Sequence, residues 1–417
     1  MFILEKRNKM SDNNIKILIN TLPKRIRPVA RFLRHQESAS GLSTTRYIQD
    51  VSTCLIPKAV FSRSIEDLTE NTFLETSEEA LIYLSPVLVG EHIARKAFSK
   101  KLPKALKKEV AETGVNLVNK GMVNSIVKQN NKKVLPVKAA IALAATAIPL
   151  TEYSLNYIKN LMTLKLFKKS DFKNIASLEH NQEDKSHQEK VEKSAKKHIA
   201  FAASLYAGLL GLAGLLAARG KNSRVLQKIS EFIVAPGNKL FSKNEKAKNF
   251  VNKYFNMDFN KSKNGKLVLS KGQLTTCVLV GGCGYFGASA DRGKENLKET
   301  ATRFPLVALY VITGSELVEK GFKNFLHKRG KCKDVLNDNK EVTPFEQLDK
   351  LAARLAKEKG TTVEQEFKSL VKQKGLIFGL PYLFALGVMG FFVSGMTVRA
   401  TKKRYQNEQN KQNKLAA

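Results

Sequence analysis

Two long stretches without a single charged residue are the strongest constraint on how this chain can fold. They are Ile199–Ala218, IAFAASLYAGLLGLAGLLAA, and Gly375–Val398, GLIFGLPYLFALGVMGFFVSGMTV. A bilayer core about 30 Å thick is crossed by about 20 mostly apolar residues of helix. Both stretches reach this length, and Lys and Arg residues that suit the headgroup region follow each of them. The sequence therefore predicts an integral membrane protein.

Three further segments are weaker candidates for membrane spans. Val134–Leu150 is apolar apart from Lys138, Gln273–Ala290 is uncharged but rich in glycine, and Phe304–Ser315 is short. Ala80–Gly90 has only about half the length that a span needs, so an interfacial position suits it better. We expect an all-α, multi-pass helical membrane protein of about five spans, with amphipathic helices at the membrane surface.

The distribution of Lys and Arg gives the expected topology. With five spans and the N-terminus inside, the inside segments hold 50 Lys and Arg residues and the outside segments hold 20. A sixth span at Ala80–Gly90 would give 32 inside and 38 outside. Because basic residues are enriched on the cytoplasmic side, we favour five spans. This topology places Asn71 and Lys120 on the cytoplasmic side and Glu299 on the opposite side.

The apolar segments divide the chain into four regions, one of which contains a polar insert. They are a basic N-terminal cytoplasmic helical region (1–79), a first membrane region (80–218), a basic connecting loop (219–272), and a second membrane region (273–417) with a cytoplasmic helical insert (319–374). Two helix starts are expected in the polar regions. Thr76 with Glu79 has the spacing of a capping box, and so does Thr343 with Glu346, where Gly360 is placed to end the helix.

The chain is strongly basic, and this bears on its partners. Its formal net charge is +34, from 71 Lys and Arg against 37 Asp and Glu. The positive charge is spread over every loop, no helix-turn-helix or zinc-finger pattern stands out, and there is no Trp. Anionic lipid headgroups therefore suit the charge better than nucleic acid does. We expect the lipid bilayer of the bacterial cytoplasmic membrane as the partner, with a protein partner or a homo-oligomer left open.

One glycine-rich motif raises the question of a nucleotide site. Gly282–Gly287 reads GCGYFG, which matches the G-x-G-x-x-G pattern of dinucleotide-binding loops, and the apolar Thr275–Val280 precedes it. No alternation of strands and helices follows, so we favour a membrane helix and expect no cofactor. On a helix Gly281, Gly284 and Ala288 share one face, where their small size would let a neighbouring helix approach closely.

Four polar residues mark the ends of apolar runs and are the candidate functional residues. They are Glu91, His92, Glu152 and Glu316. A carboxylate at or inside the membrane is costly unless it is paired or hydrated, so it is a candidate for proton or cation handling. The plainer alternative is that each of these residues marks the point where a helix emerges into water.

No metal site or catalytic motif is expected. The four Cys residues lack paired spacing, and His180 and His187 lie in a polar run without a Cys ligand. The sequence holds no H-E-x-x-H motif, no P-loop and no paired-carboxylate pattern. We therefore expect a non-enzymatic scaffold, assembly factor or transporter-like module, with a membrane-associated enzyme as the alternative.

Overall fold

The structure is helical almost throughout. This computed structural model describes residues 13–37, 42–85, 131–257, 260–261 and 267–416. Within these ranges the named strands are β1 (Asn260–Lys261) and β2 (Leu267–Val268), which pair antiparallel with Asn260 opposite Val268 and Lys261 opposite Leu267. The all-α fold class expected from the sequence is confirmed.

The chain forms two compact units. Unit 1 comprises Met1–Thr53 and Thr313–Met389, and unit 2 comprises Cys54–Ile312 and Gly390–Ala417. Unit 1 contains α2 (Arg27–Glu37), α17 (Ser315–Lys328), η5 (Phe345–Gln347), α18 (Leu348–Lys359) and α19 (Val363–Phe384). Unit 2 contains both strands and α4 (Ile65–Ser85), α8 (Asn131–Ala145), α9 (Ala147–Phe167), α10 (Phe172–Ile175), α11 (Lys185–Arg219), η3 (Gly220–Asn222), α12 (Arg224–Val234), α13 (Pro236–Leu240), α14 (Glu245–Phe255), α15 (Lys271–Asp291), α16 (Lys294–Leu309) and α20 (Val393–Ala416). Three helices run across the unit boundaries, namely α3 (Leu42–Val60) and the π-helices η4 (Tyr310–Gly314) and η6 (Ala385–Phe392).

Unit 1 has its own apolar core, built around two aromatic rings. Phe345 and Phe367 are fully buried and meet edge to face, with ring centroids 6.2 Å apart. Lys374 lies over the Phe345 ring and reaches Glu37 at 2.6 Å. The helix α18 ends at Gly360, whose left-handed φ of 65° favours a residue without a side chain. The predicted end of this helix is therefore confirmed.

Both predicted helix starts are wrong. Thr343 caps no helix, because η5 begins at Phe345 without a side-chain cap and α18 begins only at Leu348. The helix α4 runs without interruption from Ile65 to Ser85, so Thr76 and Glu79 lie inside it rather than at its N-terminus. The Thr76 hydroxyl instead donates to the Thr72 carbonyl one turn earlier, at 2.6 Å. A capping-box spacing inside a longer helix therefore leaves the helix intact, because the backbone donors there already have partners.

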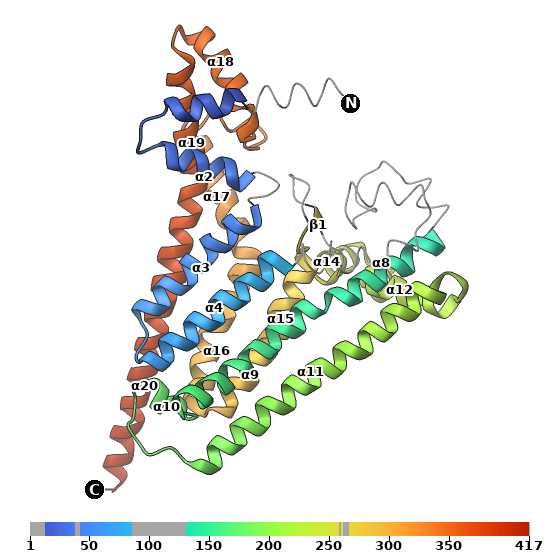
Figure 1. The fold of residues 1–417 in the computed structure, drawn as a ribbon, viewed down its shortest axis with the longest axis vertical. Helices are drawn as coiled ribbons and strands as arrows, with labels where there is room; N and C mark the ends of the chain where they lie inside the picture. The colour runs from blue at the N-terminus through green and yellow to red at the C-terminus, as the bar shows by residue number, and fades with distance from the viewer. Residues whose placement is uncertain (1–12, 38–41, 86–130, 258–259, 262–266, 417) are drawn as a thin grey trace. The chain divides into compact units, whose positions relative to one another are not determined.

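The long helices α9 and α11 lie antiparallel in unit 2, and Figure 1 shows them side by side. Side chains fix their register. The Tyr153 hydroxyl lies 2.5 Å from His198 Nδ1, and the Tyr206 hydroxyl donates to the Ala144 carbonyl at 3.1 Å. The helix α8 continues the line of α9 along α11. The hairpin therefore places two of the predicted membrane spans next to each other.

The helix α15 packs on α9 through its small residues. Asn160 donates its amide to the Ala288 carbonyl at 2.9 Å. A Cβ added at Gly284 would lie 2.5 Å from the Tyr153 carbonyl oxygen, so the two backbones are in close contact. The helix predicted for Gln273–Ala290 is confirmed, and the strand and loop that a dinucleotide site needs are absent there.

Three helices of the described chain are long and apolar enough to cross a membrane, fewer than the five spans expected. They lie in Lys132–Phe167, Lys185–Asn222 and Val363–Leu415. The other two predicted segments are helical too, in α15 and in α16 with η4. Gly, Thr and Ser dilute the apolar character of the first, and charged residues flank the second. Helix length and hydropathy therefore support three spans.

Replacing Gly284 with Ala is expected to lower the free energy of unfolding by about 1–3 kcal/mol, because the new methyl group collides with the α9 backbone. Gly208 is the matched control, since it lies within α11 and nothing lies within 4 Å of its Cβ position. There the same change is expected to be neutral or stabilising, because Ala favours helix over Gly by about 1 kcal/mol. Thermal unfolding in detergent measures both. Equal Tm values for the two variants would contradict the close packing of α15 on α9.

Candidate functional site

The candidate site begins at the N-terminus of α4, where local hydrogen bonds fix the first turn. Ser64 Oγ accepts from the Asp67 backbone N–H at 3.0 Å, which caps the helix. The same hydroxyl donates to the Ile175 carbonyl at 2.5 Å and so ties α4 to α10. Asp67 Oδ2 accepts in turn from the Arg63 backbone N–H at 3.1 Å. This capping determines where the side chains of Arg63 and Asp67 can reach.

Arg63 is held between two carboxylates. Its Nε donates to Asp67 Oδ2 at 3.0 Å, and its Nη1 and Nη2 donate to the two Glu299 oxygens at 2.8 and 3.1 Å. The guanidinium also lies over the Phe172 ring, 5.1 Å from the centroid. Burial by itself would lower the pKa of Arg63, but the carboxylates of Glu299 and Asp67 raise it above its ordinary value. Arg63 is therefore a permanent cation that joins α4 to α16.

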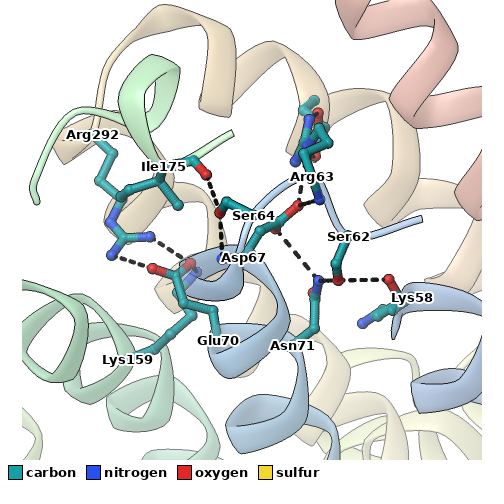
Figure 2. Close-up of polar contacts among 11 residues, drawn as sticks. Lys58, Ser62, Arg63, Ser64, Asp67, Glu70, Asn71, Lys159, Ile175 and Arg292 are labelled. Carbon is teal, nitrogen blue, oxygen red and sulfur yellow. Dashed lines mark hydrogen bonds and ion pairs between the residues drawn. The ribbon is translucent and has the colours of Figure 1, made fainter. Parts of the chain in front are cut away.

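Glu70 and Arg292 form a buried ion pair at the centre of the site, as Figure 2 shows. Arg292 Nη1 donates to Glu70 Oε2 at 2.7 Å, and Nη2 lies 2.7 Å from Oε1. Thr163 donates its hydroxyl to Glu70, and Lys159 Nζ lies 3.9 Å from it. Burial by itself would raise the pKa of Glu70, but Arg292 and Lys159 lower it below its usual range. The ionised carboxylate therefore joins α4, α9 and the end of α15.

A third group of charges joins α3, α4 and α16. Lys58 and Glu75 are in direct contact, and Arg303 Nη2 lies 3.8 Å from a Glu75 oxygen. Burial lowers the pKa of Arg303 to about 10, so this side chain is still a cation at neutral pH. Together the three groups form the α4 network, which consists of Lys58, Arg63, Asp67, Glu70, Glu75, Lys159, Arg292, Glu299 and Arg303.

A small cavity lies among these charges. It has a volume of about 30 Å³ and is lined by members of the α4 network, by Asn71, and by Ser394 and Thr397 of α20. A buried water needs about 10–15 Å³ of such volume, so the cavity has room for about two waters and for no organic substrate. The charges around it pair with one another. This arrangement can hold helices together, and it leaves no room for a reacting molecule.

The cavity does not fit the topology expected from the Lys and Arg distribution. Asn71 and Glu299 both line it. Arg63, which lies just before the helix that carries Asn71, binds Glu299 directly. Two residues that line one small cavity do not fit an arrangement that places a membrane between them. Several Lys and Arg residues, such as Arg63 and Arg292, pair with carboxylates inside the protein, so a count of Lys and Arg overstates the positive charge that is free for other partners.

The face of α9 that points into unit 2 carries a buried polar stripe. Glu152, Asn156, Lys159, Asn160 and Thr163 are all buried, and they recur on successive turns of one helix face. The Asn156 amide donates to the Glu152 carbonyl at 3.3 Å. A helix of a soluble protein buries its apolar face. On α9 the buried side chains are polar as well as apolar, with Leu155 and Leu164 among the apolar ones.

The candidate residues from the sequence fall in different parts of the structure. Glu91 and His92 lie outside the described residues. Glu152 is buried on α9, where a Cβ added at Gly281 of α15 would lie 2.6 Å from its carboxylate oxygen. Glu316 belongs to α17 in unit 1 and forms an exposed ion pair one turn along the helix. The structure thus brings Glu152 together with Gly281 and assigns Glu316 to the other unit.

Sequence reasoning missed Glu70 and Arg292 as a pair. One signal was available. Between Arg63 and Arg95 there is no Lys or Arg, and the same stretch holds seven Asp and Glu residues. If such an acidic stretch is buried, Lys and Arg from other segments must pair with its carboxylates, and a chain with a net charge of +34 has many of them. The sequence does not say which segments supply them.

One Ser–His contact resembles a catalytic pair but has a structural role. Ser170 Oγ lies 2.8 Å from His187 Nδ1, and His187 Nε2 lies 3.1 Å from the Asp291 carbonyl. Ser170 is only 1% exposed and also bonds to Glu183 at 2.9 Å. A nucleophile must reach the substrate, and this hydroxyl cannot. These contacts hold the segment 168–184 against α11 and α15.

One group in the described part of the chain has the spacing of a metal site. Cys54 Sγ and carboxylate oxygens of Glu75 and Glu79 lie within 4.8 Å of one another. Lys58 and Arg303 already pair with Glu75. Two cations at such short range oppose the binding of a third positive charge. The group therefore does not support a metal site.

No protein-family model matches the chain, and neither a search of curated proteins nor a search of solved structures finds a match. The class of protein therefore rests on the fold and on the α4 network.

Replacing Arg292 with Gln is expected to lower the free energy of unfolding by about 3–5 kcal/mol, because an ionised Glu70 would be buried without its partner. The double replacement Glu70→Gln with Arg292→Gln is expected to recover part of this loss, since it removes both charges. Glu316→Gln, which breaks an exposed ion pair, is expected to change little. Denaturant unfolding in mixed micelles measures all three. A loss for Arg292→Gln no larger than that for Glu316→Gln would show that the pair does not stabilise the fold.

The same pair predicts an acid-sensitive fold. Because the pKa of Glu70 is lower in the folded chain than in the unfolded chain, its contribution is complete above the unfolded value of about 4.3. This contribution is lost as the pH falls through the folded value. Tm is therefore expected to fall less steeply for Glu70→Gln than for the unmodified protein from about pH 5 to about pH 3. Parallel curves for the two proteins would contradict the lowered pKa.

Proposed function

We propose that the chain is an integral membrane protein in which the hairpin of α8, α9 and α11, together with the α19–α20 helix, crosses the bilayer. The observation that carries this proposal is the alignment of two apolar runs. Tyr153 meets His198 at one end of the hairpin, and Pro136 meets Gly220 at the other. Between these contacts lie the long apolar runs of both helices. One slab about 30 Å thick would contain both runs at once.

The surface of α11 and of the α19–α20 helix supports the proposal, while the apolar window in Lys132–Phe167 is 72% buried within the protein. Only 17% of the apolar window of α11 is buried, and Phe201, Leu205, Leu210 and Leu215 are all exposed. The window in Val363–Leu415 is also only 17% buried. Continuous apolar surface on this scale is costly in water and stable in lipid.

The α4 network lies beyond one end of the apolar slab. Lys159 and Thr163, which contact Glu70, lie about 9 and 15 Å farther along α9 than Tyr153, at 1.5 Å per residue. Charges at this level avoid the cost of the hydrocarbon core. Glu70 and its partners are therefore on one side of the membrane, and the start of α8 at Asn131 is on the other.

Within the membrane the protein acts as a non-enzymatic scaffold or assembly module. Glu70, Glu75 and Glu299 each contact Lys or Arg of another segment, as Glu70 does with Arg292 and Glu299 with Arg63, and Asp67 pairs with Arg63 four residues before it. The cavity beside them has room for about two waters. A site of this kind fixes helices rather than binding a substrate. The exposed apolar helices then provide a surface for lipid or for another membrane protein.

A transporter-like module is the second candidate, and the polar stripe on α9 favours it. Glu152, Asn156 and Asn160 are buried next to the apolar run of the same helix, which is the place where carriers keep polar side chains. One variant distinguishes the scaffold from the transporter-like module. Glu152→Gln would leave a scaffold unchanged, and it would abolish proton uptake by a carrier reconstituted in liposomes.

Single cysteines at the two ends of α11 are expected to lie on opposite sides of the membrane. The native Cys54, Cys277, Cys283 and Cys332 are replaced first. Lys190→Cys and Lys221→Cys then report two exposed positions. An impermeant thiol reagent is expected to label one of them in sealed vesicles and the other only after permeabilisation. Labelling of both from the same side would mean that α11 does not cross.

The protein is also expected to stay with the membrane fraction in alkaline carbonate and in high salt. Apolar burial holds an integral protein, and salt weakens only its electrostatic contacts. Sedimentation of washed membranes followed by immunoblotting measures the retained fraction. Release of the protein by high salt alone would mean that it is attached peripherally, and it would contradict the proposed membrane spans.

A further inference from the structure

The segment that follows α11 exposes both positive charge and apolar side chains. Residues 224–255, which form α12, α13 and α14, contain seven Lys and Arg against two Glu. Both acids are paired within the segment, Glu231 with Lys239 at 2.6 Å and Glu245 with Lys248 at 3.6 Å. The large apolar side chains that the segment exposes are Val225, Phe232, Leu240, Phe241, Phe250 and Phe255.

Charges and rings share the same helix faces. On α14, Phe250 lies between the exposed Lys246 and Lys253, four residues after the first and three before the second. On α12, Val225 and Phe232 are exposed two turns apart on one face. A surface that alternates cations with apolar side chains suits the boundary between charged headgroups and acyl chains.

The three helices hold this surface in a fixed orientation. Asn252 Oδ1 accepts from the Gly237 backbone N–H at 2.8 Å, and the Asn252 amide donates to Asn238 at 3.0 Å, which joins α14 to α13. On its inner face, α12 packs Leu226 and Ile229 against the apolar cluster of α8 and α11. The outer face of the three helices therefore cannot fold back into the protein.

Continuity with α11 places this surface at the membrane boundary. Only η3 and the N-cap residue Ser223 separate the end of α11 from α12. Leu226 belongs to the same apolar cluster as Leu216, which lies two residues before the end of the uncharged run. If α11 crosses the bilayer, α12 lies at the level where that run meets the headgroups.

We propose that the outer face of α12, α13 and α14 is a binding surface for anionic lipid headgroups, with Phe232, Phe250 and Phe255 inserted beside the acyl chains. The proposal rests on the membrane position of α11 proposed above. The chemistry favours lipid over nucleic acid or a protein, because covalent continuity with α11 brings this basic surface to the headgroups in every copy. Each nearby basic residue strengthens such binding about fivefold.

A single introduced Trp tests the position of the surface, since the chain has no Trp of its own. The test variant is Phe250→Trp. Leu210→Trp in the apolar run of α11 is the membrane reference, and Leu415→Trp, which is 88% exposed, is the aqueous reference. Proteoliposomes contain phosphatidylcholine, with or without phosphatidylglycerol, and with bromine at a known depth. Phe250→Trp is expected to emit at shorter wavelength than Leu415→Trp and to be quenched most by bromine near the headgroups.

The references separate the two proposals. If Leu210→Trp is quenched and Phe250→Trp behaves like Leu415→Trp, the lipid surface is wrong and the membrane spans stand. If Leu210→Trp is not quenched either, both proposals fall. A blue-shifted but unquenched Phe250→Trp would mean that protein covers the surface, which also overturns the lipid proposal.

Charge reversal tests the headgroup contribution. In the Phe250→Trp background, Lys246→Glu with Lys253→Glu is expected to abolish the extra quenching that phosphatidylglycerol gives, a loss of about fivefold in headgroup affinity per lysine removed. Lys350→Glu with Lys357→Glu on α18 is the matched control, with the same spacing and the same exposure, and is expected to have no effect. Unchanged dependence on phosphatidylglycerol in the first pair would contradict a role for these lysines.

Discussion

The bond between Glu70 and Arg292 is the interaction on which the arrangement of unit 2 depends. An acidic helix such as α4 cannot be buried by itself, because ionised carboxylates are costly away from water. Arg292 at the end of α15 neutralises Glu70, and Lys159 of α9 supplies a second cation. The Glu70 carboxylate thereby joins α4, α9 and the end of α15, which are far apart in the sequence, through contacts between opposite charges. The polar side chains of α9 are then buried in unit 2, while most of the apolar run of α11 is exposed.

Composition alone is enough to find the helices that are long and apolar enough to cross a membrane, but it does not show which charges are paired inside the protein. Ile199–Ala218 and Gly375–Val398 lie in helices long and apolar enough to span, because this property depends on neighbouring residues only. The topology depends on how many Lys and Arg residues face lipid headgroups. Arg63 and Arg292 do not, since they bind carboxylates of Glu299 and Glu70 inside the protein. No local pattern distinguishes such residues from those that meet the membrane surface.

The start of α4 shows the same limit on a smaller scale. The spacing of Thr76 and Glu79 fits a capping box, and so does the spacing of Ser64 and Asp67. The structure caps α4 at Ser64, whose hydroxyl also bonds to Ile175, and the Asp67 side chain accepts from the Arg63 backbone N–H and side chain. The sequence contains both signals, and only contacts with distant segments select between them. For the same reason, the ion pairs of the α4 network could not be predicted from the sequence.

The three passages between the units each have an irregular hydrogen-bond ladder. Pro57 in α3 lacks the N–H that would bond to Thr53, the last residue of unit 1 before the boundary. The other two passages lie within η4 and η6, whose π-helical turns are common where helices bend. The chain therefore passes between the two units at three places, and at none of them does an unbroken α-helical hydrogen-bond ladder run across.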